Sequence, residues 1–160
     1  MKGVVTTSVA IQSVASVKIS HAYVLDSTSQ QRDMDIQRID KDLLNELLQK
    51  ALKSERHRYA HDLRNSPEDT SQRILNTLLP DTEVPIHRHE DTNETTICLC
   101  GNLHVVFFEE REGAFKEISR VRLCPEEGSY GVQIPIGAWH TVQVHEVSVI
   151  FEAKDGAYGK

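Results

Sequence analysis

The stretch that decides the fold is residues 86–101, which read Ile-His-Arg-His-Glu-Asp-Thr-Asn-Glu-Thr-Thr-Ile-Cys-Leu-Cys-Gly. His87 and His89 stand two residues apart, so on a strand both imidazoles project from the same face, about 6.6 Å apart along the chain. That spacing lets two imidazoles converge on one ion. Residues 90–93 predict a turn. Glu94 then opens the returning strand beside the histidines, where it can supply a carboxylate oxygen.

A second segment follows forty residues later, at 134–140, with the sequence Ile-Pro-Ile-Gly-Ala-Trp-His. Pro135 and Gly137 predict a tight turn, and His140 opens the next strand. A third imidazole would complete a site of three nitrogens and one oxygen. Such a site suits Zn, Fe, Mn or Ni as a divalent ion, with positions left for water or substrate. Two alternatives remain: the histidines line a polar barrel without metal, or Glu94 only bonds nearby groups.

The sequence around these segments has the residue pattern of a mainly β domain. From about Gln72, short runs rich in β-branched and aromatic residues alternate with turn residues, which is typical of a sandwich or small barrel. The predicted strands are 73–79, 83–89, 94–100, 104–109, 115–124, 130–134, 140–144 and 147–153.

One amphipathic helix precedes the strands. Leucines and alanines recur at i, i+3, i+4 spacing over residues 43–52, Asp40 can cap the first turn, and the helix should end near Ser54. Further upstream, apolar residues alternate with polar ones over 9–25, which predicts a strand. The predicted organisation is therefore a strand extension and linker at 1–35, a helical lead-in at 36–66 and a barrel at 67–160.

Taken together, the two histidine segments resemble the two motifs of the cupin superfamily. The chain is most similar to the WbuC-type cupin-fold metalloproteins, through residues 72–76, 85–89, 137–142 and 151–158, and the likeness spans about 36–160. The resemblance implies a double-stranded β-helix, or jelly-roll barrel, with His87, His89, Glu94 and His140 as ligands of one divalent transition metal. Asp81, Ser129 and Val144 depart from the usual motif residues, and these departures concern turn geometry and pocket lining rather than the ligand set.

Composition narrows the function classes. The 160 residues carry 18 Lys and Arg against 24 Asp and Glu, a net charge of −6, which argues against nucleic acid or an anionic membrane as partner. The N-terminal region has no continuous apolar run of signal-peptide length. Three cysteines, an odd number in a chain of this size, favour reduced thiols in a cytoplasm. Cys98 and Cys100 should share one strand face as small buried hydrophobes, and Cys124 is interpreted as structural.

Four residues are candidates for substrate binding. Arg56 and Arg58 belong to a basic cluster in an acidic chain, where planar guanidinium groups can hold phosphate or carboxylate, and Arg73 could do the same. The alternative for this cluster is a solvated helix end. Trp139 is either a packing residue or part of the pocket wall.

These observations predict a mononuclear metal protein that binds or acts on a small polar or anionic molecule. The resemblance suggests a sugar or sugar nucleotide. As an enzyme it would be an isomerase or epimerase, a hydrolase or a dioxygenase, and no separate catalytic residue can be named. The alternatives are a non-catalytic binding module and a structural dimer. The N-terminal strand predicts a homodimer with strand exchange.

Overall fold

The structure of the chain, a computed structural model, describes residues 36–156 and is mainly β. The predicted strand at 9–25 and its exchange between subunits lie outside these residues. The described elements are one helix, α1 (Lys41–Leu52), one 3₁₀ turn, η1 (Pro125–Glu127), and eight strands: β1 (Arg58–Asp62), β2 (Ser71–Leu78), β3 (Glu94–Cys100), β4 (Leu103–Arg111), β5 (Ala114–Leu123), β6 (Gly131–Ile134), β7 (Trp139–Val144) and β8 (Ser148–Asp155).

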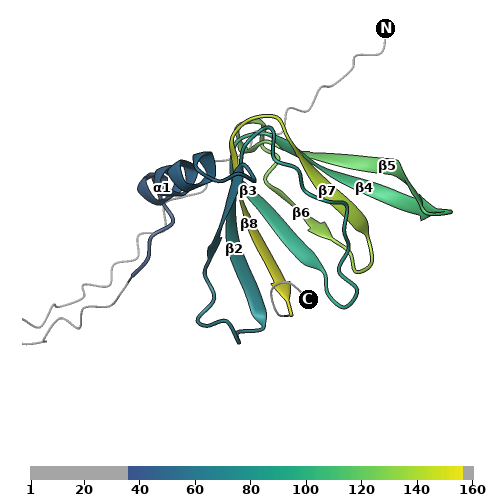
Figure 1. Cartoon of the computed structure of the whole chain (residues 1–160), viewed down its shortest axis with the longest axis horizontal. Helices are drawn as coiled ribbons and strands as arrows, with labels where there is room; N and C mark the ends of the chain where they lie inside the picture. Colours follow the sequence, from purple (N-terminus) through teal and green to yellow (C-terminus); the bar gives the residue numbers. More distant parts are fainter. Residues whose placement is uncertain (1–35, 157–160) are drawn as a thin grey trace, which may run out of the picture. The chain divides into compact units, whose positions relative to one another are not determined.

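The strands form two antiparallel sheets (Figure 1). The larger sheet has the order β1-β2-β8-β3-β6 and the smaller has the order β5-β4-β7. One apolar core joins them, with Leu78, Cys98, Ile134 and Ile150 from the larger sheet and Leu103, Val105, Leu123 and Val144 from the smaller. This arrangement confirms the predicted fold class, a mainly β double-stranded β-helix with one helix.

Helix α1 covers the outer face of the larger sheet. The Asp40 side chain accepts a hydrogen bond from the Leu43 amide at 3.2 Å, as the capping prediction requires. Leu47 is fully buried where the helix packs against β1 and β2. Leu75 and Thr77 of β2 are also fully buried, and they lie on the face opposite Asn76. Within residues 36–156, no helix has the length and apolar character that a membrane span requires.

The region around β1 differs from the prediction. Residues 58–62 follow the helix as a strand, paired antiparallel with β2 from Arg58↔Leu78 to Asp62↔Ile74. The basic cluster is therefore not a solvated helix end. β1 lies at the edge of its sheet and its residues are only half-buried or exposed, so its sequence lacks the apolar alternation that marks a strand.

The prediction of a strand at 83–89 is wrong, because this segment forms no continuous ladder with another strand. Only an isolated bridge joins His87 to His140, through hydrogen bonds of 3.0 and 2.8 Å between their backbones. Pro85 lacks the N–H that a continuous ladder would need. The Thr141 hydroxyl instead donates to the Val84 carbonyl, so the segment is held beside β7 by a side chain.

The prediction for the cysteine pair is wrong at Cys100. The pairing of β3 with β8 shifts register between Cys98 and Cys100. A bulge rotates the residues that follow it, so Cys98 is buried while Cys100 is exposed. Cys124 is buried, and all three thiols are free.

Candidate metal centre

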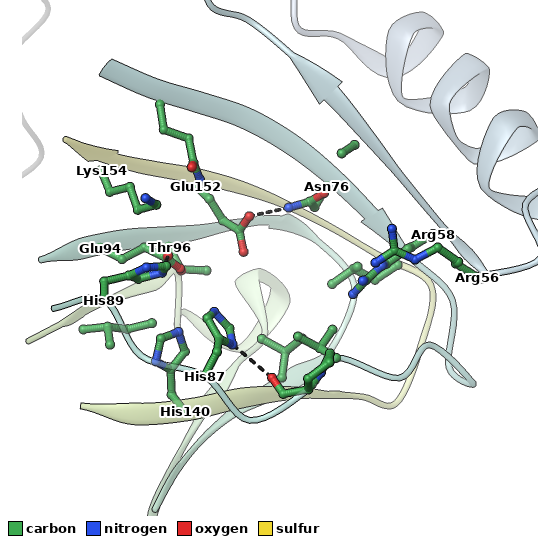
Figure 2. A pocket seen from close by; sticks show the side chains of 17 residues that line it. Arg56, Arg58, Asn76, His87, His89, Glu94, Thr96, His140, Glu152 and Lys154 are labelled. Carbon is green, nitrogen blue, oxygen red and sulfur yellow. Dashed lines mark hydrogen bonds and ion pairs between the residues drawn. The ribbon is translucent and has the colours of Figure 1, made fainter. Parts of the chain in front are cut away.

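Four side chains from both sheets and from the segment before β3 converge on one point (Figure 2). His87 and His89 come from the segment before β3, Glu94 opens β3, and His140 is the second residue of β7. One ligand atom from each lies within 4.8 Å of the others. The imidazole centroids are 4.3 to 5.7 Å apart. The structure thus brings together all four residues that the sequence selected.

Backbone contacts between the two motif segments fix this convergence. The Gly137 amide donates to the His89 carbonyl at 2.8 Å, and the Ile136 amide donates to Asn93 Oδ1 at 2.9 Å. Gly137 has a φ of +74°, a conformation that favours glycine at this turn. The Pro-x-Gly turn is therefore docked onto the turn that separates the histidine pair from Glu94.

Two histidines have their tautomer set by the backbone. His87 Nδ1 lies 3.0 Å from the Pro85 carbonyl, and His140 Nδ1 lies 2.9 Å from the Ala138 carbonyl. A carbonyl oxygen only accepts, so in each neutral ring Nδ1 carries the hydrogen and Nε2 keeps its lone pair. His140 Nε2 is buried and has no hydrogen-bond partner in the described part of the chain.

Glu94 lies against the histidines as a buried carboxylate. His89 Nε2 is 2.7 Å from Glu94 Oε2, and the Thr96 hydroxyl donates to Oε1 at 3.1 Å. Burial raises the pKa of Glu94, but the His89 hydrogen bond and the nearby imidazoles outweigh it and hold the pKa below its usual value. Glu94 therefore forms hydrogen bonds with nearby groups, as the alternative without direct metal ligation expected. Its carboxylate nevertheless lies within the cluster of possible ligand atoms.

The donor set fits a divalent transition metal. Burial lowers the pKa of His140 below its usual value, which keeps the ring neutral. Metal ligands must be neutral imidazoles and ionised carboxylates. Backbone carbonyls orient His87 and His140 through their second ring nitrogens, which is the arrangement typical of metal-binding histidines. Among the described residues, His140 Nε2 is the one cluster atom that is buried without a hydrogen-bond partner.

The cluster opens into a cavity of about 380 Å³, which Figure 2 shows from close by. Arg56, just before β1, and Arg58, the first residue of β1, both reach the cavity. Buried Lys154 reaches it from β8. None of these three cations forms an ion pair with a described carboxylate. The other arginines that follow α1 each contact one: Arg64, Arg73, Arg88, Arg111, Arg120 and Arg122.

Arg73 and Trp139 are not brought to this cavity. Arg73 contacts Asp69 at 2.8 Å, on the opposite face of β2 from Gln72. Trp139 precedes His140 on β7 and faces away from it, against Phe115 at 4.9 Å between centroids and under the Arg88 guanidinium at 4.5 Å. Trp139 is therefore a packing residue, the first of the two predicted roles.

The cavity-wall residues that sequence reasoning missed include Asn76, Glu152 and Lys154. The strand alternation could have placed Glu152 and Lys154 on one face of β8, because residues two apart on a strand share a face. Which face points inward depends on the pairing with β2 and β3, which the sequence does not show.

The fold and the cluster together define a double-stranded β-helix protein in which three histidines and one glutamate meet at one point. The chain belongs to the family described as "Domain of unknown function (DUF6016)", whose model matches residues 39–120, half of the chain. No curated protein sequence matches the chain significantly.

Solved structures similar to the chain include two whose descriptions name a cupin domain. A conserved protein of unknown function from Streptococcus pyogenes, SPY1581, aligns with a TM-score of 0.49 and 11% identity over 66% of this chain and 80% of that one. A cupin-2 domain protein from Shewanella frigidimarina aligns at 0.46 and 18%, over 71% and 91%. The Cnp3 cupin domain from Schizosaccharomyces pombe aligns at 0.47 and 11%, over 62% of this chain and less than two thirds (64%) of that one. With TM-scores below 0.5, the fold assignment rests on the strand pairing itself.

Proposed function

We propose that the chain binds one divalent transition metal through His87, His89, Glu94 and His140, and holds a small anionic molecule beside it. The observation that carries this proposal is the unpartnered, buried Nε2 of His140, aimed into a cluster of three further donors. Burying a polar atom without a partner costs about 1–3 kcal/mol. A metal would remove that cost.

The anionic character of the molecule follows from the charges on the cavity wall. Arg56, Arg58 and Lys154 contribute three positive charges, against the carboxyl groups of Glu94 and Glu152. Guanidinium groups without a carboxylate partner are ready to bind phosphate or carboxylate oxygens in pairs. A bound metal would add further positive charge and would act as a Lewis acid toward an oxygen of the molecule.

A sugar acid, sugar phosphate or sugar nucleotide fits these features, in keeping with the likeness of the sequence to WbuC-type cupins. The cavity volume of about 380 Å³ lies within the usual range for small-molecule sites. An ion with a purely structural role would not need a cavity lined by three cations that have no ion-pair partner among the described residues. We therefore favour ligand binding over a metal that only holds the barrel together.

The test is metal analysis of the protein purified without chelator. We expect close to one metal per chain, and loss of most of it in His87→Ala and His140→Ala. Cys98→Ser is the matched control, because burial and the neighbouring Cys100 and Cys124 raise the pKa of the Cys98 thiol to about 11, which keeps it protonated. Wild-type protein that neither contains nor rebinds Zn²⁺, Fe²⁺, Mn²⁺ or Ni²⁺ would refute the proposal.

A further inference from the structure

Glu152 faces the metal centre from the middle of the larger sheet. On β8 it lies opposite Ile74 of β2 and Thr96 of β3. Two residues further along the same two strands, Glu94 of β3 is paired with Lys154 of β8. The side chain projects from β8 into the cavity, toward the histidines (Figure 2). The carboxyl group is therefore part of the wall that a molecule beside the cluster would touch.

The fold itself makes little use of this carboxyl group. Its one hydrogen-bond partner among residues 36–156 is the Asn76 amide, which donates to Oε2. Asp69 shows the contrast, since it accepts from the backbone amides of Asn65 and Ser71 and from the Arg73 side chain. A carboxylate with a structural role is normally satisfied in that way. Among residues 36–156, Glu152 Oε1 has no such partner.

The surroundings of Glu152 favour the presence of a proton near neutral pH. Burial and the negative charge of Glu94 on β3 raise its pKa to about 8, against the opposing effects of the Asn76 hydrogen bond and the Lys154 charge. The three imidazoles and the guanidinium groups of Arg56 and Arg58 face the same cavity from other elements. A carboxyl group that is partly protonated at the working pH can both accept and return a proton.

We propose that Glu152 is the acid–base residue of this pocket, exchanging a proton with a hydroxyl group of the molecule held beside the cluster. In the forward step the ligand O–H bond breaks, the proton moves to Oε1 and the electron pair stays on the ligand oxygen. The return step reverses each change, so no oxidant or reductant is consumed. This inference rests on the proposed function, because the molecule must lie between Glu152 and the cluster.

Carboxyl modification tests the inference without a known substrate. A water-soluble carbodiimide with an added amine attacks protonated carboxyl groups, and peptide mass mapping gives the rate at each residue. At neutral pH we expect Glu152 to react at least about tenfold faster than exposed Glu126, because each unit of pKa changes the protonated fraction tenfold. The rate should fall as the pH rises through about 8. Inorganic phosphate, bound at the guanidinium groups, should slow the reaction.

Three variants extend the test. Glu152→Gln should abolish the fast modification, and Glu126→Gln should leave it unchanged. Arg58→Ala should remove the protection by phosphate. A carboxyl group with a merely structural role would stay unmodified in the folded protein while exposed carboxylates react, and that result would overturn the inference.

Metal content measured on the same samples separates this inference from the proposed function. Full metal content with an unreactive Glu152 would overturn the acid–base role alone. Low metal content with fast, phosphate-sensitive modification would contradict the metal site, and would still support Glu152 as the proton-exchanging group of the cavity.

Discussion

Gly101 shows how one residue can control the connection between the two sheets. It follows β3 with a φ of +97°, and a Cβ built on it would overlap Ser148 Oγ and the Val147 carbonyl oxygen and lie 2.6 Å from Ser148 Cα. Gly101→Ala therefore adds a steric clash to an unfavourable backbone conformation. We expect the free energy of unfolding to fall by about 3 kcal/mol, measured by urea denaturation.

Gly113 provides the matched control for this prediction. It joins β4 to β5 with a φ of +79°, and a Cβ built there meets no atom within 4 Å. Gly113→Ala should therefore lose only the backbone contribution, about 1 kcal/mol. Equal losses in the two variants would show that crowding by Ser148 does not constrain Gly101.

Helix α1 depends on a narrow apolar face. Leu47 is fully buried against the sheet, whereas Leu52 at the end of the same helix is 56% exposed. Leu47→Ala should lower the free energy of unfolding by about 3 kcal/mol, because it removes buried methyl groups and leaves a cavity. Leu52→Ala should change it by less than about 0.5 kcal/mol. Thermal or urea unfolding of the two variants measures the difference, and similar losses would contradict the packing of α1 on β1 and β2.

The elements that the sequence predicted well are those whose periodicity reflects burial on one face. Helix α1 and strand β3 have such patterns, and β3 was predicted with its observed bounds. Strand β1 was missed because it lies at a sheet edge, where half-exposed polar residues are tolerated. The segment at 83–89 has the alternation of a strand, but Pro85 and the docking of His87 on His140 limit its pairing to one bridge.

The residues of the candidate site also differ in how well the sequence predicts them. The four cluster residues could be chosen from the sequence because two short motifs carry them, each motif is local in sequence, and both motifs resemble those of cupins. Glu152 and Lys154 could not be chosen, since their place beside Glu94 depends on the pairing of β8 with both β2 and β3. Arg73 was placed wrongly for the same reason, because one residue of offset on β2 turns its side chain to the opposite face.

The pH dependence of folding for the whole metal-free molecule should reveal the carboxyl group of Glu152. Because burial raises the pKa of Glu152 from 4.5 to about 8, the native state keeps a proton that the unfolded chain loses, and stability falls as pH rises through this interval. The lowered pKa of His140 has the opposite effect, but only at pH values below about its usual 6.5.

Between about pH 6.5 and 8, the Glu152 contribution is therefore no longer opposed by His140. We expect the free energy of unfolding of the wild type to fall there, with a slope of at most about 1.4 kcal/mol per pH unit. Glu152→Gln cannot ionise, so its stability should be nearly independent of pH over the same range. Urea denaturation at several pH values in the presence of chelator measures both slopes. Parallel slopes in the two proteins would mean that Glu152 is already ionised in the native state, because only a proton held by the fold can link its burial to pH.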